Sequence, residues 1–183
     1  PAQTAVTVTL SNGATITINA GTSSGTVSVA APADDPYVDA STVNTTITAA
    51  TGGNFENLTV NPGAATTTVT DTLDTTTVSL TGSASVAEGA SGAYTVSLTA
   101  PAQTAVTVTL AYSGIANDGT DFSGVATVTI PAGASSANFS VPTLNDVLAE
   151  GDESFTVTLA AASGGNFENL VLGAGGSPVT TTI

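Results

Sequence analysis

The chain has 183 residues, of which 41% are hydrophobic and 4% aromatic, and it contains no Lys, Arg, His, Cys, Met or Trp. Its formal net charge of −14 would repel nucleic acid and anionic membranes, and no apolar run approaches the roughly 20 residues that span a bilayer. The same absences exclude disulfides, zinc sites built from His or Cys, and Ser-His-Asp catalysis. Because no basic side chain can neutralise them, clustered carboxylates must repel one another, take up protons or bind a cation.

The chain is an imperfect internal repeat. Two segments occur twice: residues 1–10 as 101–110, and 52–58 as 164–170. The first pair is offset by 100 residues and the second by 112, so the second copy carries 12 extra residues, at about 111–122. Copies of about 100 residues are domain-sized. We expect Phe55 and Phe167, in the second repeated segment, to anchor small satellite cores.

Both copies alternate apolar and polar residues with a period of two, which indicates half-buried β-strands. The alternating apolar residues are, in chain order, Val6/Val8/Leu10, Ile16/Ile18, Val27/Val29, Val43/Ile47, Val78/Leu80, Tyr94/Val96/Leu98, Val106/Val108/Leu110, Val128/Ile130, Phe139/Val141 and Phe155/Val157/Leu159. Turn residues separate them, as at 11–13 and 131–133. No segment shows a helical period. The sequence therefore predicts an all-β fold of two antiparallel β-sandwiches in tandem.

The boundary between the copies falls near residues 71–74, so we predict one domain at 1–72 and a second at 73–183. Residues 75–100 of the second copy have no counterpart before Pro1. We therefore expect the first domain to lack its N-terminal strand or strands. An open sheet edge of this kind permits strand exchange with another chain.

An acidic run lies directly before the predicted strand at 155–159. Asp146, Glu150, Asp152 and Glu153 fall within eight positions. Ca²⁺ prefers carboxylate and carbonyl oxygens from flexible loops, so the run predicts a Ca²⁺-binding loop, although its spacing is not that of an EF-hand. A plain solvated loop is the alternative.

The first copy carries its own acidic residues, which lie in its central turn and at its exit. They are Asp34, Asp35, Asp39, Asp71 and Asp74. These aspartates would form a Ca²⁺ site that stiffens the joint between the domains. Asp34-Asp35-Pro36 also fits an ordinary turn, and the sequence leaves both interpretations open.

Three ordered motifs in the second copy carry a family resemblance. They are Val-Ala-Glu-Gly at 86–89, Gly-Thr-Asp-Phe at 119–122, and Asn145-Asp146 leading to Glu150 and Glu153. In this order they resemble the Calx-β domain, and more closely the Ig-like tandem repeats of giant RTX biofilm adhesins of the large adhesion protein type. The resemblance implies Ig-like (Calx-β-like) sandwiches with Ca²⁺ ligands at Glu88, Asp121, Asp146, Glu150 and Glu153.

The sequence departs from the Calx-β pattern at two motif positions. Asn145 stands where an aspartate is usual, and Phe122 where a tyrosine is usual. The exit aspartates of the pattern would follow Ile183. We therefore expect fewer bound ions than in a full Calx-β site.

The resemblance implies a structural extender repeat of an extracellular, cell-surface adhesin, exported by type I secretion from a Gram-negative bacterium. Its partners would be neighbouring repeats of the same long chain, and Ca²⁺ would stiffen loops and joints. A carbohydrate- or protein-binding adhesion module is the alternative. Glycosidases also use paired carboxylates, but in clefts lined by sugar-stacking aromatics, and this chain has no Trp. We expect no enzyme.

Overall fold

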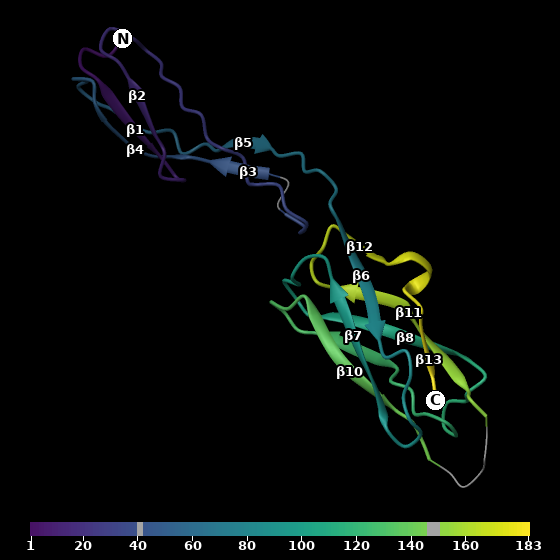
Figure 1. Cartoon of the computed structure of the whole chain (residues 1–183). Helices are drawn as coiled ribbons and strands as arrows, with labels where there is room; N and C mark the ends of the chain where they lie inside the picture. Colours follow the sequence, from purple (N-terminus) through teal and green to yellow (C-terminus); the bar gives the residue numbers. More distant parts are fainter. Residues whose placement is uncertain (40–41, 146–150) are drawn as a thin grey trace. The chain divides into compact units, whose positions relative to one another are not determined.

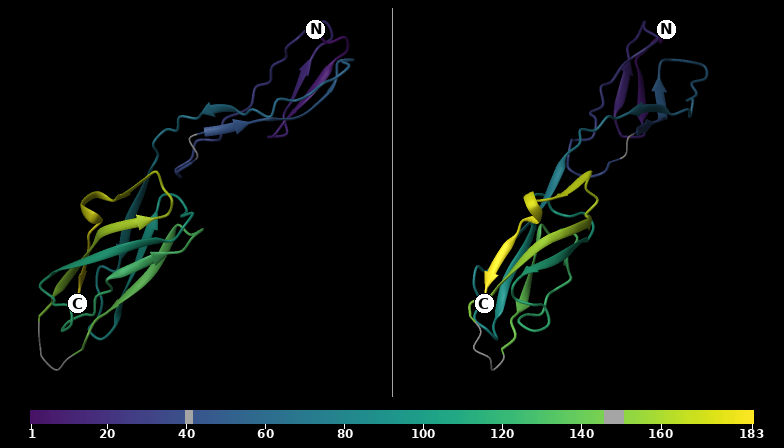
Figure 2. Two further views of the ribbon diagram at one scale, coloured as in Figure 1. Left: turned by 180° about the vertical axis from the view of Figure 1, so that it is seen from behind. Right: turned by 90° about the vertical axis from the view of Figure 1, so that its right-hand side faces the viewer.

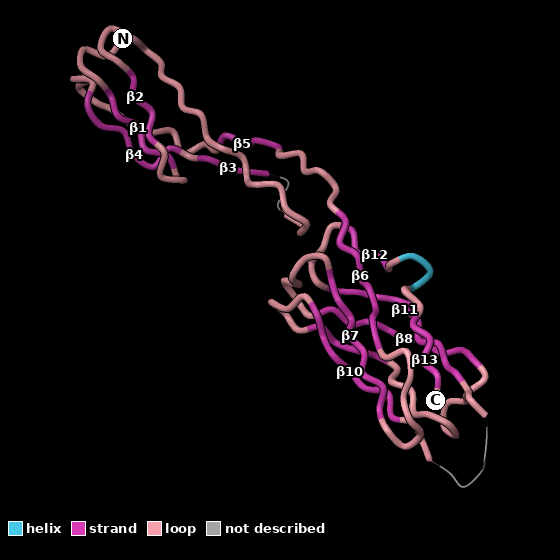
Figure 3. Tube along the Cα trace, viewed as in Figure 1, coloured by secondary structure: helices cyan, strands magenta, loops and turns pink. Residues whose placement is uncertain are grey.

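A computed structural model of the chain describes residues 1–39, 42–145 and 151–183. The chain forms two compact units, of which the first comprises Pro1–Asp34 and Asp39–Thr72 and the second Asp35–Val38 and Leu73–Ile183. The fold is all-β, as the period of two predicted, and the described elements are strands plus one three-residue 3₁₀ helix (Figure 3). Within the described ranges, no helix combines the length and the apolar character that crossing a bilayer requires.

The second unit is a sandwich of two four-stranded sheets (Figures 1 and 2). In spatial order, one sheet contains β10 (Ser136–Pro142), β7 (Ser91–Leu98), β6 (Thr75–Gly82) and β12 (Asn169–Leu172). The other contains β13 (Val179–Thr182), β11 (Ser154–Gly164), β8 (Val106–Gly114) and β9 (Thr127–Ile130). Neighbouring strands are antiparallel, except that β12 runs parallel to β6. The 3₁₀ helix η1 (Ala174–Gly176) lies between β12 and β13.

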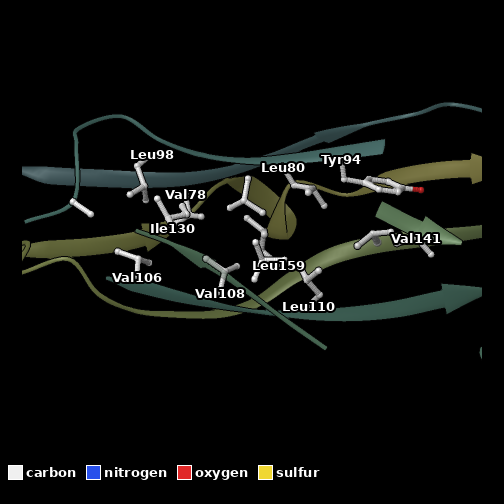
Figure 4. Close-up of a cluster of buried hydrophobic side chains, with 14 of the residues drawn as sticks. Val78, Leu80, Tyr94, Leu98, Val106, Val108, Leu110, Ile130, Val141 and Leu159 are labelled. Carbon is white, nitrogen blue, oxygen red and sulfur yellow. The ribbon is translucent and has the colours of Figure 1, made fainter. Parts of the chain in front are cut away.

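The core of the second unit lies between the two sheets. Figure 4 shows Leu80, Tyr94 and Leu98 from one sheet facing Val106, Val108 and Leu110 from the other. These residues are the apolar positions of the alternating pattern, so one face of each strand is removed from water. This burial stabilises the fold by about 25 cal/mol per Å² of apolar surface. Aromatic rings fill one part of this core. Phe122 stacks on Phe155 with ring centroids 4.3 Å apart.

A buried tyrosine joins the two sheets of the second unit. The Tyr94 hydroxyl lies 2.5 Å from the Thr181 hydroxyl, which donates to the Ser83 carbonyl at 2.6 Å. The Tyr94 ring lies over Gly82, where a Cβ atom would come within 2.1 Å of the ring, so a side chain at this position would displace the tyrosine. Burial raises the pKa of Tyr94, and the Thr181 hydrogen bond opposes this shift. The tyrosine therefore fixes β7 against β13.

The first unit contains two smaller sheets. One has the order β2 (Thr15–Ile18), β1 (Val6–Leu10) and β4 (Ile47–Gly52), and the other pairs β3 (Thr42–Thr45) with β5 (Ala65–Thr68). Both sheets are antiparallel. The buried core is small and comprises Ala2, Val6, Val8 and Leu10.

The extra residues of the second copy lengthen one strand. Residues 111–114 extend β8 beyond Leu110, so that β8 pairs with residues 155–164 of β11. In the first unit β1 ends at Leu10, and two separate strands, β3 and β4, occupy the positions that correspond to β11. The part of the strand that both copies have keeps the same register to its neighbouring strand. Leu110 of β8 opposes Leu159 of β11, and its counterpart Leu10 of β1 opposes Ile47 of β4, which corresponds to Leu159.

Two expectations for the first unit are wrong. Val27 and Val29, predicted in a strand, lie in irregular backbone and are 39% and 49% exposed. Phe55 is 47% exposed and anchors no satellite core, whereas its counterpart Phe167 is only 8% exposed. Phe167 is covered because Tyr37 stacks on it with centroids 5.5 Å apart. Local alternation did not reveal that these segments lack covering partners.

Candidate metal site

Three of the predicted ligands line one small cavity at an end of the second unit. The cavity measures about 90 Å³ and is lined by Glu88, Thr120, Asp121, Leu144, Gly151, Glu153 and Ile183. Glu88 follows β6, Asp121 lies in the inserted segment and Glu153 directly precedes β11. The sandwich therefore brings together carboxylates that lie more than 30 positions apart in the sequence.

Backbone hydrogen bonds hold the turn that carries Asp121. The Asn117 amide donates to Asp121 Oδ2 at 2.6 Å, and the Asp121 amide donates back to the Asn117 carbonyl at 3.0 Å. The Leu144 amide donates to the Asp121 carbonyl at 2.9 Å. The next residue, Phe122, is buried in the core. One Asp121 oxygen is thus bound to its own turn, while the side chain borders the cavity.

Glu153 faces Asp121 across the cavity. Both side chains line the cavity, and Glu153 is half-buried. Partial burial raises the pKa of Glu153, and the charge of Asp121 and the hydrogen bond to it raise this pKa further. Two carboxylates this close disfavour each other's ionisation, so the deprotonated pair favours a nearby cation.

Glu88 lies on a tight turn that the neighbouring chain braces. The Ala90 amide donates to the Ala87 carbonyl at 3.0 Å. The Thr143 hydroxyl lies 3.0 Å from the Ala87 carbonyl and 3.0 Å from the Ala90 carbonyl. Gly89 completes the turn with a φ of +76°, a conformation that glycine adopts without strain. The turn places Glu88 at the rim of the cavity, where its side chain is exposed.

Asp118, the other carboxylate of the inserted segment, does not line the cavity. Its Oδ1 accepts the Gly124 amide at 2.8 Å, which closes the loop on itself. Nearby, the Tyr112 hydroxyl donates to the Val125 carbonyl at 3.1 Å, and the Val125 amide donates to the same hydroxyl at 2.9 Å. Burial raises the pKa of Tyr112, which the Asp118 charge raises further. This half of the inserted segment is therefore structural.

The donor chemistry of the cavity fits Ca²⁺ in kind. Asp121 and Glu153 offer carboxylate oxygens to one cavity, and Thr120, which bears a hydroxyl group, also lines it. Within the described ranges, no three acidic side chains are close enough together to enclose an ion. Asp146 and Glu150 lie outside the described residues, and their assignment as ligands stays a prediction.

The predicted joint site is divided between the two units. Asp34, Asp39 and Asp71 belong to the first unit, and Asp35 and Asp74 to the second. In the first unit, Thr72 donates from its hydroxyl to Asp34 at 2.6 Å and from its amide to Asp71 at 3.1 Å. Asp39 is exposed.

The two aspartates in the second unit have local structural contacts. Asp35 Oδ1 accepts the Tyr37 amide at 2.9 Å, which is the hydrogen bond of an Asx turn. The Asp74 amide donates to Glu168 Oε2 at 2.7 Å. The ordinary-turn interpretation therefore accounts for Asp35, and Glu168, to which the sequence assigned no role, holds the backbone at the start of β6.

Sequence reasoning missed the role of Tyr37. Its hydroxyl donates to the Pro101 carbonyl at 2.6 Å, and its ring stacks on Phe167. The Val38 amide donates to the Asn166 carbonyl at 3.0 Å, and the Glu168 amide to the Pro36 carbonyl at 3.1 Å. The only available signal was an aromatic residue within an otherwise acidic turn.

Three solved structures are similar to this chain. The apo form of the Calx CBD1 domain is 24% identical over 59% of this chain and 95% of its own, with a TM-score of 0.50. The CBD12 region of CALX1.2 is 23% identical over 58% of this chain and 44% of its own, with a TM-score of 0.49, and the Calx CBD2 domain is 14% identical over 58% and 85%, with the same score. The first of these similarities defines a Calx-β-like fold.

The family follows from the sequence itself. The model of the LapA domain matches residues 1–72 and 74–183, which is nearly the whole chain. The chain therefore belongs to the LapA domain family, and the resemblance to repeats of large biofilm adhesion proteins is confirmed. No curated protein sequence matches the chain.

Proposed function

We propose that the chain is a pair of extender repeats, residues 1–72 and 73–183, of a large adhesin at the bacterial cell surface, and that Ca²⁺ stiffens them. The observation that carries the proposal is the convergence of Glu88, Asp121 and Glu153 on one cavity, where the Glu153 pKa is raised. No Lys, Arg or His in the chain can neutralise these groups. A divalent cation does so with the oxygen ligands it prefers.

The rest of the proposed site and its setting follow from the sequence. Asp146 and Glu150 would complete the coordination around the cavity. The aspartates at 34, 35, 39, 71 and 74 would form a second site, for which the bonds from Thr72 to Asp34 and Asp71 offer support. Neighbouring repeats of the same chain would be the partners, and type I secretion from a Gram-negative bacterium the export route. The role is mechanical rather than catalytic.

The stabilisation expected from each ion is modest. Extracellular Ca²⁺ modules bind with Kd values of about 10⁻⁴–10⁻³ M. Binding stabilises the folded state by about 0.4 kcal/mol when free Ca²⁺ equals Kd and by about 2.7 kcal/mol at 100 times Kd. Such gains in stability matter when they are repeated along a stalk of many repeats, because each repeat that unfolds makes the stalk longer and more flexible.

The test is calorimetric unfolding of the full chain in Ca²⁺ and in EDTA, with Ca²⁺ binding measured by isothermal titration. We expect a Tm several degrees higher in Ca²⁺. Asp121→Asn with Glu153→Gln should abolish most of this increase, whereas Glu56→Gln, an exposed carboxylate remote in sequence from the site, should retain it. Equal Tm values in Ca²⁺ and EDTA for the parent chain would refute the proposal. Binding of the full chain to a glycan array without Ca²⁺ dependence would indicate an adhesive module instead.

A further inference from the structure

A short segment of the first copy is part of the second unit. Residues 35–38 belong to the second unit, although the residues on both sides of them, up to Asp34 and from Asp39, belong to the first. Residues 35–37 are half-buried, whereas Asp34 and Asp39 are exposed. The chain therefore enters the second unit at residue 35, leaves it after residue 38 and enters it again at residue 73.

The segment binds the second unit through its backbone. Tyr37 forms an antiparallel bridge to the chain just before β12. On one side of this bridge the Val38 amide donates to the Asn166 carbonyl at 3.0 Å. On the other side the Glu168 amide donates to the Pro36 carbonyl at 3.1 Å. Paired backbone bonds of this kind are the means by which an extended peptide adds to a free β edge.

The Tyr37 side chain anchors the segment. Its ring stacks on Phe167 with centroids 5.5 Å apart and an interplanar angle of 24°, and its hydroxyl donates to the Pro101 carbonyl at 2.6 Å. Phe167 belongs to the core of the second unit, and Tyr37 packs against that core. Val38, by contrast, is 58% exposed. Side-chain recognition therefore depends on one aromatic residue, which uses both its ring and its hydroxyl.

The acceptor turn is held by bonds that do not involve the segment. The Phe167 ring lies over Gly165, where a Cβ atom would come within 2.2 Å of the ring. Asn166 has a φ of +60°, and its side-chain amide donates to Gln103 Oε1 at 2.7 Å. The Gly165 amide donates to Thr104 Oγ1 at 3.1 Å. The turn therefore presents the Phe167 ring and the Asn166 carbonyl independently of the segment.

The segment is also shaped for binding. Asp35 Oδ1 accepts the Tyr37 amide at 2.9 Å, and the ring of Pro36 fixes its own φ. A peptide that is held in its bound shape loses less entropy on binding. At the equivalent positions of the second copy, 112 residues later, the sequence has Leu148 and Ala149 in place of Pro36 and Tyr37. The binding sequence is thus particular to the first copy.

We propose that the turn at 164–168, together with the Pro101 carbonyl, is a recognition surface for an extended Asp-Pro-Tyr-Val segment, and that residues 35–38 act there as a clip that carries tension past residues 39–72. While the clip is closed, a pull on residue 34 reaches the second unit through residues 35–38. The 34 residues from 39 to 72 then form a closed loop outside the loaded path. Opening the clip places them in that path and makes available about 110–120 Å of extended chain, at roughly 3.3–3.6 Å per residue.

The clip is independent of Ca²⁺. That the chain bears tension rests on the proposed function as an extender repeat, but the contacts of the clip lie within the second unit. They are backbone hydrogen bonds, one hydroxyl bond and one ring stack, none of which needs an ion. The measurements below are made in EDTA, so failure of the clip leaves the Ca²⁺ proposal untouched. Equal Tm values in Ca²⁺ and EDTA would likewise leave the clip untouched.

The first test pulls on the full chain in optical tweezers. The chain has no cysteine, so Ala31→Cys and Thr109→Cys give two unique attachment points, one before the clip and one on the interior strand β8. At constant force, the parent should release the length of residues 39–72 when the clip opens. Tyr37→Ala should release the same length about tenfold faster or more, because the stack and the hydroxyl bond are lost. Val38→Ala, which removes only an exposed side chain of the same segment, should match the parent. Equal release rates for the parent and Tyr37→Ala overturn the proposal.

The second test measures recognition by amide hydrogen exchange of the full chain without attachments. Tyr37→Ala should lower protection about tenfold or more at the Val38 and Glu168 amides. Protection should stay unchanged at the Thr143 amide, which donates to the Ala90 carbonyl at 2.8 Å elsewhere in the second unit. Unchanged protection at Val38 and Glu168 overturns the proposal.

A gentler variant keeps the proposal testable if Tyr37→Ala also exposes the Thr143 amide. Tyr37→Phe retains the ring and removes only the hydroxyl bond to Pro101. It should release residues 39–72 faster than the parent and lower protection at Val38 and Glu168, by smaller factors than Tyr37→Ala. Parent values in both measurements overturn the proposal.

Discussion

The two units share a repeated sequence but differ in how completely their strands are covered. In both, the segment that starts Pro-Ala-Gln-Thr forms the central strand of a sheet, with the same register to its neighbour. In the second unit the β6–β7 hairpin and the longer β8 close a sandwich around 18 buried side chains among the described residues. Among the described residues of the first unit, the corresponding core holds four. The comparison teaches that alternation specifies which face of a strand is apolar, while a partner strand decides whether that face is buried.

The largest expected effect concerns the aromatic part of the second core. Phe155→Ala should destabilise the second unit by about 3–5 kcal/mol, because the fully buried ring stacks on Phe122 and leaves a cavity when removed. The same substitution at Phe55, which is 47% exposed, should cost less than about 1 kcal/mol. Urea unfolding followed by far-UV circular dichroism measures both. Similar losses at the two positions would contradict the contrast between the units.

A smaller effect is expected at an equivalent pair of valines. Val141→Ala should cost about 1.5–3 kcal/mol, since Val141 is fully buried between the sheets. Val29→Ala, at the corresponding position of the first unit, should change stability by no more than about 0.5 kcal/mol. Differential scanning calorimetry of the two variants and the parent provides the comparison. A large effect at Val29 would mean that the segment at 24–30 is already packed in the free chain.

The smallest expected effect is the pH dependence due to Glu153. Its folded-state pKa is raised, so in EDTA its contribution favours folding below the ordinary value near 4.5 and is lost as the pH rises through the raised value. Glu153→Gln should flatten this part of the stability profile, whereas Glu56→Gln should leave it unchanged. In Ca²⁺ the trend should reverse, because the ion binds the deprotonated pair. Tm measured from pH 4 to 7, in EDTA and in Ca²⁺, would show the trend and its reversal. Parallel Tm profiles for the parent chain and Glu153→Gln would contradict the assignment of this pH dependence to Glu153.

Much of the fold could be predicted from the sequence. The period of two predicted the strands, and the two repeat offsets located the insertion that lengthens β8. The strand expected at Val27 and Val29 does not form, because its neighbour in the other unit, β7, has no counterpart among the described residues of the first. Strand identity is partly a property of the neighbouring chain, which local pattern does not contain.

The candidate site was less accessible from the sequence. Composition alone predicted that carboxylates would need a cation, but not which of them would meet. Glu88, Asp121 and Glu153 line one cavity only because the chain after β6, the inserted turn and the start of β11 lie at one end of the sandwich. Their grouping came from a family resemblance. The structural roles of Asp118 and Glu168, which bind backbone amides, had no distinguishing signal in the sequence.

The distribution of tyrosines makes the two units optically distinct. All three tyrosines of the chain, Tyr37, Tyr94 and Tyr112, belong to the second unit, and the chain has no tryptophan. Intrinsic fluorescence excited near the tyrosine band therefore reports on the second unit alone, while the first is silent. A fluorescence melt set beside a calorimetric one separates the two unfolding events in the native sequence, with no label and no truncation.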